Sequence, residues 1–341
     1  MDARRLAGSL LVTGFDGPKL SARTERALAR GERAGVILFR RNAPDVASIA
    51  SIAAAVQATR PPEEIDPLLV AIDEEGGRVS RLPAPEVKLP PMRLVGRIGS
   101  ADLARRSGFA VGARLCALGV NLDFAPILDV DSNPNNPVIG DRSFSSNPGV
   151  VAELALAFAQ GLRDGGVLPC GKHFPGHGDT DKDSHHDLPV LTHDRGRLDA
   201  IELVPFRAAC KAGIESIMSA HVVVRAFDPN VPATLSSSMM TDLLRTQLGF
   251  GGVLISDDLE MRAVAATYPV EESAVRAVLA GCDLLLVCSD EDLADRAHAA
   301  LATEIEASST FASRAREAAG RVQTLRARAR TLAASSVPSR W

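Results

Sequence analysis

The sequence predicts an α/β protein with the architecture of a single-domain (β/α)8 barrel, the TIM-barrel fold. Eight short apolar runs alternate with longer amphipathic stretches along the 341 residues. Continuous apolar runs of this length are typical of parallel strands that are buried on both faces. A doubly wound sheet is the alternative, and it is weakened because no Gly-rich dinucleotide fingerprint follows the first run.

The expected strands are the apolar runs Ser9–Phe15, Gly35–Phe39, Leu68–Ile72, Val120–Val130, Val167–Lys172, Ser216–His221, Gly252–Ser256 and Asp283–Cys288. Amphipathic spacing predicts the helices between them, and several begin with proline or end before glycine, which are usual helix boundaries. These helices are Pro44–Thr59, Ala101–Leu118, Pro148–Arg163, Asp194–Ala212, Ser237–Leu248 and Val270–Leu279.

The last segment, Asp290–Trp341, is rich in alanine and arginine and is expected to close the barrel as two helices around Ser308. We expect its arginines to form a solvated face. The eight strand–helix units use nearly the whole length, and no Gly, Ser or Pro-rich linker interrupts them. Residues 1–341 are therefore expected to form one catalytic barrel.

Composition excludes several classes of protein. The net charge of −4 comes from 38 basic and 42 acidic residues, which argues against a nucleic-acid partner. No apolar run is long enough for a membrane span, and the first residues lack a convincing signal-peptide cleavage site. The five cysteines are scattered without a CxxC pair, so neither a disulfide framework nor a structural zinc site is expected. These features favour a cytoplasmic protein.

Charged residues follow five of the predicted strands directly. Charges next to buried strands are costly unless they are paired or used. The connections after four strands are also longer than a barrel needs, and this end of a barrel carries the active sites of such enzymes. Any single acid could instead be structural, and we expect Asp258 to cap the following helix. The strand-end charges are Asp73, Glu74, Glu75, Asp129, Asp131, Lys172, His173, His221, Asp257 and Asp258.

The connection after the fifth strand is rich in histidine and aspartate. Five of the seven histidines lie within Lys172–His193, in the segment KHFPGHGDTDKDSHHDLP and the residues that follow it. Such a loop suggests metal binding or proton transfer. No closed zinc motif is present, although an open two-metal site stays possible. For proton transfer, Asp183-Ser184-His185 supplies a histidine beside a carboxylate that could fix its tautomer.

The chain resembles glycoside hydrolase family 3, most closely the bacterial β-N-acetylglucosaminidases of the NagZ type. The resemblance extends from about residue 5 to residue 330 and is carried by four motifs in the same order. They are IDEEGGRVSR from Ile72, DRSF from Asp141, KHFPGHGDT…DSHHDLP from Lys172 and ISDDLEM from Ile255.

The resemblance implies a role for each matching residue. Asp257 would be the nucleophile, and His185 the general acid/base that Asp183 orients. The pocket for the terminal N-acetylglucosamine would contain the residues Asp73, Arg81, Arg142, Lys172, His173 and Met261. A retaining glycosidase forms a covalent glycosyl–enzyme intermediate, and a histidine of near-neutral pKa can first donate and later accept the proton.

The resemblance also implies a substrate: muropeptide fragments of peptidoglycan in cell-wall recycling, cleaved without cofactor or metal by an expected monomer. Phosphorolysis on the same site is the first alternative, because a neutral histidine would tolerate phosphate. A metal-dependent barrel hydrolase is the second. A non-catalytic sugar-binding protein is disfavoured, since it would need neither nucleophile nor acid/base pair.

Overall fold

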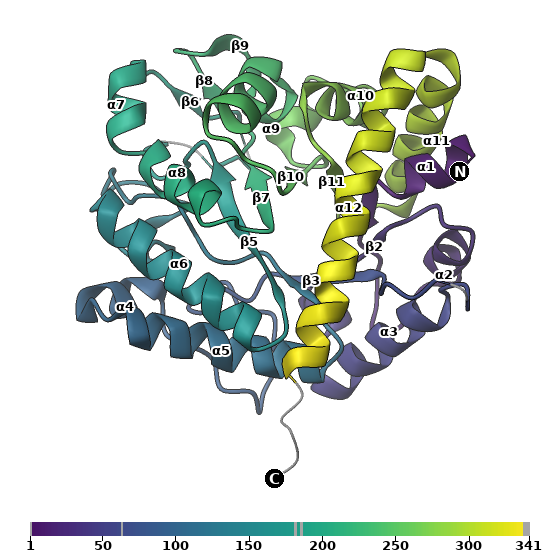
Figure 1. Cartoon of the computed structure of the whole chain (residues 1–341), viewed down its shortest axis with the longest axis horizontal. Helices are drawn as coiled ribbons and strands as arrows, with labels where there is room; N and C mark the ends of the chain where they lie inside the picture. Colours follow the sequence, from purple (N-terminus) through teal and green to yellow (C-terminus); the bar gives the residue numbers. More distant parts are fainter. Residues whose placement is uncertain (1, 63, 181–182, 185–186, 337–341) are drawn as a thin grey trace.

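The computed structural model describes residues 2–62, 64–180, 183–184 and 187–336. Eight parallel strands close into a barrel in the order β1-β11-β10-β7-β5-β4-β3-β2 (Figure 1). The predicted (β/α)8 fold is confirmed, and every predicted strand is present, although the predicted Val120–Val130 is a strand only over Leu122–Asp123. The strands are β1 (Leu11–Thr13), β2 (Gly35–Leu38), β3 (Leu69–Ile72), β4 (Leu122–Asp123), β5 (Leu168–Phe174), β7 (Ser216–Ser219), β10 (Val253–Asp258) and β11 (Leu284–Val287).

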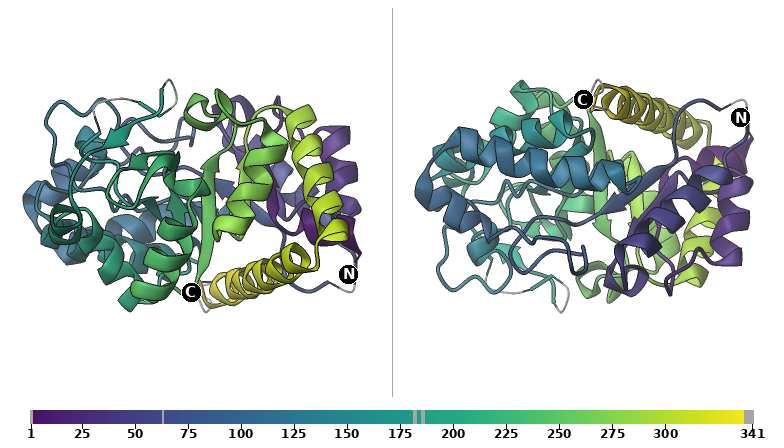
Figure 2. Two further views of the ribbon diagram at one scale, coloured as in Figure 1. Left: turned by 90° about the horizontal axis from the view of Figure 1, so that it is seen from above. Right: turned by 90° about the horizontal axis from the view of Figure 1, so that it is seen from below.

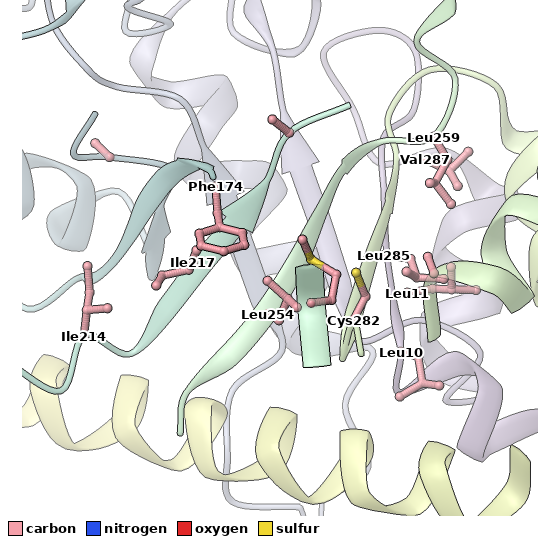
Figure 3. Close-up of a cluster of buried hydrophobic side chains, with 14 of the residues drawn as sticks. Leu10, Leu11, Phe174, Ile214, Ile217, Leu254, Leu259, Cys282, Leu285 and Val287 are labelled. Atoms are coloured by element: carbon pink, nitrogen blue, oxygen red, sulfur yellow. The ribbon is translucent and has the colours of Figure 1, made fainter. Parts of the chain in front are cut away.

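Side chains alternate between the inside and the outside of the barrel along each strand, as the strand period of two requires. In β3, Leu69 and Ala71 belong to the cluster that fills the barrel. Val70 and Ile72 belong to the larger cluster between the barrel and its helices. Figure 3 shows part of that outer cluster, with Leu254 near Cys282. Both faces of the strands are therefore apolar, which explains the continuous hydrophobic runs.

Helices surround the barrel, and most begin at a side chain that accepts hydrogen bonds from the first turn. Asp45, Ser100, Asn147 and Asp290 do so for four of them. The helices are α1 (Ala3–Gly8), α2 (Ala22–Ala29), α3 (Val46–Ala58), α4 (Met92–Ile98), α5 (Ala101–Ala117), α6 (Pro148–Asp164), α7 (Arg195–Ala200), α8 (Leu203–Lys211), a π-helix (Ser238–Gln247), α9 (Arg262–Ala265), α10 (Val270–Ala280), α11 (Glu291–Ala307) and α12 (Ser309–Ser336).

The structure differs from the sequence prediction in five helices. The short helices α1, α2, α4 and α9 were not expected, because each buries only two or three residues and leaves little periodic signal. The predicted helix Asp194–Ala212 is divided into α7 and α8 at Ile201 and Glu202. Pro205 explains the division, since a proline ring clashes with the carbonyl four residues earlier, here that of Ile201.

Helix α12 lies across the N-terminal ends of the strands (Figures 1 and 2). Its residues Val322, Leu325, Ala329 and Leu332 pack into the cluster that fills the barrel. The helix therefore closes this end of the barrel with apolar side chains.

Only part of the solvated face that we expected is present on α12: Arg316, Arg328 and Arg330 are exposed, but its other arginines are not. Arg314 and Arg321 donate to the fully buried carboxylate of Asp283, which precedes β11, at 2.7 and 3.1 Å. Arg326 is itself buried and donates to the carbonyls of Asp66 and Pro67, just before β3. Helical spacing alone could not reveal these partners, because they lie in distant parts of the sequence.

A small three-stranded sheet accompanies the barrel and contains β6 (Val190–Leu191), β8 (Val223–Val224) and β9 (Asp228–Pro232). It ties the connection that follows β5 to the connection that follows β7. Within the described residues, no helix combines the length and the apolarity needed to cross a membrane.

Candidate active site

A cavity of about 170 Å³ lies at the C-terminal ends of the barrel strands. Two wider hollows, of about 590 and 570 Å³, flank α12 at the opposite end. We assign the site to the smaller cavity, because there the strand-end charges converge. All of the predicted sugar-binding residues and the predicted nucleophile line it, namely Asp73, Arg81, Arg142, Lys172, His173, Met261 and Asp257.

Lys172 is the centre of a buried ion-pair network in this cavity. Its Nζ lies 2.6 Å from Oδ1 of Asp73 and 2.6 Å from Oε1 of Glu75. Arg142 donates two hydrogen bonds to Glu75, at 2.8 and 2.9 Å, and Arg81 lies 3.4 Å from Asp73. Paired donors of this geometry hold a carboxylate strongly. Ion pairs thus join the residues that follow β3 to the end of β5.

The charges of this network are stable near neutral pH. Burial opposes the ionisation of Asp73 and Glu75, but the neighbouring cations outweigh it and lower the pKa of both carboxyls. Burial likewise opposes the charge of Lys172, but the two carboxylates raise the pKa of its ammonium. Three cations, counting Arg81 and Arg142, meet two carboxylates. The network therefore presents one net positive charge to the cavity that Asp257 shares.

Asp257 lies near the end of β10, and its Oδ1 accepts a hydrogen bond from the backbone N–H of Asp258 at 2.8 Å. The carboxylate is half-buried and faces the cavity. A partly exposed carboxylate beside a net positive network can act as a nucleophile.

Asp258 does not cap the following helix, which corrects the sequence prediction. Strand β10 continues through Asp258, and α9 begins later, after Met261. The Asp258 carboxylate instead accepts from the backbone N–H groups of Glu260 and Cys288, at 3.1 and 3.2 Å. Burial, with the nearby charge of Glu260, raises its pKa to about 7. Asp258 thus joins the end of β10 to the end of β11.

His173 is oriented by Asp129, a strand-end acid whose role the sequence left open. Its Nδ1 lies 2.7 Å from Oδ2 of Asp129, and its backbone N–H also donates to that carboxylate. The same carboxylate accepts from the backbone N–H of His177 at 2.7 Å. Burial opposes the ionisation of Asp129, but the nearby histidines lower its pKa.

The predicted acid/base pair is described only in part. Asp183 is half-buried, and its neighbour Ser184 lines the cavity. His185 lies outside the described residues. Among the described residues, no group of three or more His, Cys, Asp and Glu side chains is arranged to hold a metal ion.

Some residues of the cavity were not predicted. Phe39 packs beneath Arg81, whose guanidinium carbon lies 5.6 Å from the ring centre. His177 and Ser184 line the cavity as well. The histidine-rich motif drew attention to His177, but nothing in the sequence distinguishes a buried serine from an exposed one.

Comparison with known proteins identifies the family of this chain. The family model described as the glycosyl hydrolase family 3 N-terminal domain matches residues 5–325. A β-hexosaminidase from Nitrosomonas eutropha is 42% identical over 282 residues, covering 81% of this chain and 79% of that relative.

Two solved structures have the same architecture. A glycoside hydrolase family 3 β-N-acetylglucosaminidase from Paenibacillus has a TM-score of 0.92 at 39% identity. The match covers all of this chain but only 64% of that longer one. NagZ from Neisseria gonorrhoeae, in complex with N-trifluoroacetyl-D-glucosamine, has a TM-score of 0.78 at 33% identity and covers 96% of this chain and 98% of its own. This chain belongs to glycosyl hydrolase family 3.

Proposed function

We propose that this glycoside hydrolase is a retaining β-N-acetylglucosaminidase that releases terminal N-acetylglucosamine from the non-reducing end of its substrate. The observation that carries the proposal is the position of Asp257 in the same cavity as the Lys172 network. The β-hexosaminidase and β-N-acetylglucosaminidase names of the relatives support the activity. A pocket, rather than an open groove, suits the removal of one terminal sugar.

The proposed reaction has two steps. The Asp257 carboxylate attacks the anomeric carbon while the glycosidic bond breaks, and His185 donates a proton to the departing oxygen. Water then attacks the same carbon, His185 takes a proton from it, and the bond to Asp257 breaks. Asp183 would hold the imidazole in the tautomer that both steps need. Two inversions at the anomeric carbon give net retention.

The sugar would be held by the charged network and by His173. Asp73 would accept hydrogen bonds from sugar hydroxyls, while Lys172, Arg81 and Arg142 would donate to others. His173 would bind through Nε2, since Nδ1 faces Asp129. Met261 would contact an apolar part of the ring. This division of donors and acceptors would fix the sugar with its anomeric carbon toward Asp257.

The finer identity of the substrate follows from the resemblance to the NagZ type. We propose muropeptides that carry terminal N-acetylglucosamine, cleaved in the cytoplasm during cell-wall recycling by a monomer without metal or cofactor. We also propose that residues 1–341 act as one catalytic barrel, closed by Asp290–Trp341.

Hydrolysis of a chromogenic β-N-acetylglucosaminide by the wild type and by Asp257→Ala tests the activity. We expect the variant to lose nearly all turnover, with an unchanged fold by circular dichroism. A fluorinated N-acetylglucosamine analogue that forms a slowly hydrolysed intermediate should add its mass to a peptide containing Asp257. Equal rates for the two proteins would end the proposal.

Two further experiments distinguish hydrolysis without metal from phosphorolysis and from metal-dependent hydrolysis. Adding phosphate should leave the product as free N-acetylglucosamine, whereas an N-acetylglucosamine 1-phosphate product would indicate phosphorolysis. Exhaustive chelation should leave the rate unchanged, whereas a loss restored by added metal would indicate a metal-dependent hydrolase.

A further inference from the structure

His177 is a buried histidine to which the proposed reaction gives no part. Only 1% of it is exposed, and both ring nitrogens have hydroxyl partners. Nδ1 lies 2.6 Å from Oγ1 of Thr180, and Nε2 lies 3.0 Å from Oγ of Ser184. Its backbone N–H donates to Asp129. A buried side chain with every polar atom paired holds its neighbours in defined positions.

The surrounding hydrogen bonds assign the tautomer of His177. The Thr180 hydroxyl donates to the carbonyl of His177 at 3.1 Å, so its oxygen is free to accept a hydrogen bond from the Nδ1–H group. Nε2 then has no proton and accepts from the hydroxyl of Ser184. Burial, with the nearby charge of His173, lowers the pKa of His177 to about 4. The ring is therefore neutral at neutral pH, and Ser184 is the donor.

Ser184 stands between Asp183 and His185 in the sequence and is held at two points. Its hydroxyl donates to His177, which follows strand β5. Its carbonyl accepts from the backbone N–H of Ala263, on α9, at 3.3 Å. Ser184 is thus connected both to the loop that follows the Lys172 strand and to the helix that follows Asp257.

We propose that His177 and Ser184 are positioning residues for proton transfer, because their hydrogen bond fixes the backbone that carries the acid/base pair. The proposal rests on the proposed function, in which Asp183 and His185 form that pair. Consecutive Cα atoms are about 3.8 Å apart, so a shift of Ser184 moves both of its neighbours. Small displacements of a catalytic group are costly, since a misplacement of about 1 Å can lower a rate about 100-fold.

A positioning role differs from a purely structural role in its dependence on the leaving group. An activated leaving group departs without a proton, whereas a sugar hydroxyl needs one. Poor positioning of the acid therefore slows glycosylation by a poor leaving group selectively. A general structural defect in the cavity slows both substrates alike.

The test compares kcat/KM for a 2,4-dinitrophenyl β-N-acetylglucosaminide and for di-N-acetylchitobiose. Ser184→Ala removes the donor, and His177→Asn removes the acceptor while an amide remains near the Nδ1 position. We expect kcat/KM to fall about 10-fold to 100-fold for chitobiose and less than about 3-fold for the activated substrate. Ser184→Thr, which keeps a hydroxyl, should recover much of the loss.

Ser216→Ala is the matched control, because that serine is also buried and donates one hydrogen bond of 2.9 Å, to the carbonyl of Pro169, at the other end of the barrel. It should show no leaving-group dependence. The double variant His177→Asn/Ser184→Ala should be no slower on chitobiose than the slower single variant, since both remove one interaction.

Asp183→Ala distinguishes the positioning role of His177 and Ser184 from the proposed acid/base pair on which that role rests. If Asp183→Ala shows strong leaving-group dependence while Ser184→Ala and His177→Asn slow both substrates equally, the positioning role is refuted and the acid/base pair stands. If Asp183→Ala shows no such dependence, the proposed pair fails, and the positioning role fails with it.

Discussion

The Nδ1 atom of His173 lies 2.7 Å from the Oδ2 atom of Asp129, and both side chains are buried. This contact fixes the imidazole ring and leaves Nε2 as the nitrogen that can reach a sugar in the cavity. A carboxylate that orients a histidine in this way also favours one tautomer. Asp129 does not line the cavity itself, and we propose that it acts on sugar binding through His173.

Asp129→Asn should weaken sugar binding, because the amide keeps the shape of the carboxylate but loses its charge. We expect KM to rise about 10-fold, as for the loss of one charged hydrogen bond. Steady-state kinetics measures this change, and Asp199→Asn on α7, a surface carboxylate, is the control. An unchanged KM would show that Asp129 supports the fold alone.

Lys172→Met should lower kcat/KM about 10-fold to 100-fold, since a charged hydrogen bond contributes about 1.5–3 kcal/mol. The substitution also leaves Asp73 and Glu75 with only their arginine partners, so the free energy of unfolding should fall. Kinetics and urea unfolding measure the two effects. Lys211→Met, on the exposed part of α8, should change neither. Wild-type kinetics in Lys172→Met would contradict its place in the sugar pocket.

His177 should make the protein less stable as the pH falls. Its folded pKa of about 4 lies below the ordinary value of 6.5, so the unfolded chain binds the proton first. The contribution of His177 to stability is complete above about pH 6.5 and is lost as the pH falls toward 4. The loss in free energy of unfolding amounts to about 3 kcal/mol.

The difference in free energy of unfolding between the wild type and His177→Asn isolates this effect. Asp258 titrates in the opposite sense, because its raised pKa favours the folded protein at low pH and the advantage is lost as the pH rises toward 7. A plot of stability against pH for the wild type alone would therefore combine the titrations of His177 and Asp258. A difference that does not change between pH 6.5 and 4 would contradict the assignment.

Asp283→Asn should destabilise the protein without changing catalysis. Its buried carboxylate accepts from Arg314, Arg321, Arg245 and the backbone of Leu254, and removing one partner of such a network costs about 3–5 kcal/mol. Urea unfolding should detect the loss, while kcat/KM at 25 °C stays at the wild-type value. Asp292→Asn, on the exposed start of α11, is the control. A loss of kcat/KM would show that the two ends of the barrel are coupled.

His185→Glu should keep the fold and lose rate. A carboxylate would carry a negative charge where we propose a neutral imidazole, and it would repel an anionic partner or substrate near the site. Chromogenic hydrolysis with circular dichroism as the folding check measures the outcome. Unchanged turnover would remove His185 from its proposed role.

The strands were predictable from the sequence because both of their faces are apolar. Every residue from Leu69 to Ile72 is hydrophobic, because the side chains alternately fill the barrel and contact the helices. The convergence of the strand-end charges was predictable too, because all parallel strands of a barrel end at the same face. Fold class and the strand-end charges that line the cavity could therefore be inferred before any coordinates.

The remaining features depend on contacts between distant residues. Asp258 stands where a helix cap is expected, yet its partner Cys288 lies just after the neighbouring strand. Arg326 has a helical spacing typical of a surface, yet it is buried against the residues before β3. The bond between His177 and Ser184 depends on how one loop folds back, which no periodic pattern records.

The position of α12 has a consequence for the order of assembly during synthesis. The residues that close the barrel, from Val322 to Leu332, are translated after all eight strands. Domains begin to fold while the ribosome is still adding residues. The apolar end of the emerging barrel therefore stays uncovered until this helix is released from the ribosome. Apolar surface that is exposed during this interval makes the nascent chain prone to aggregation.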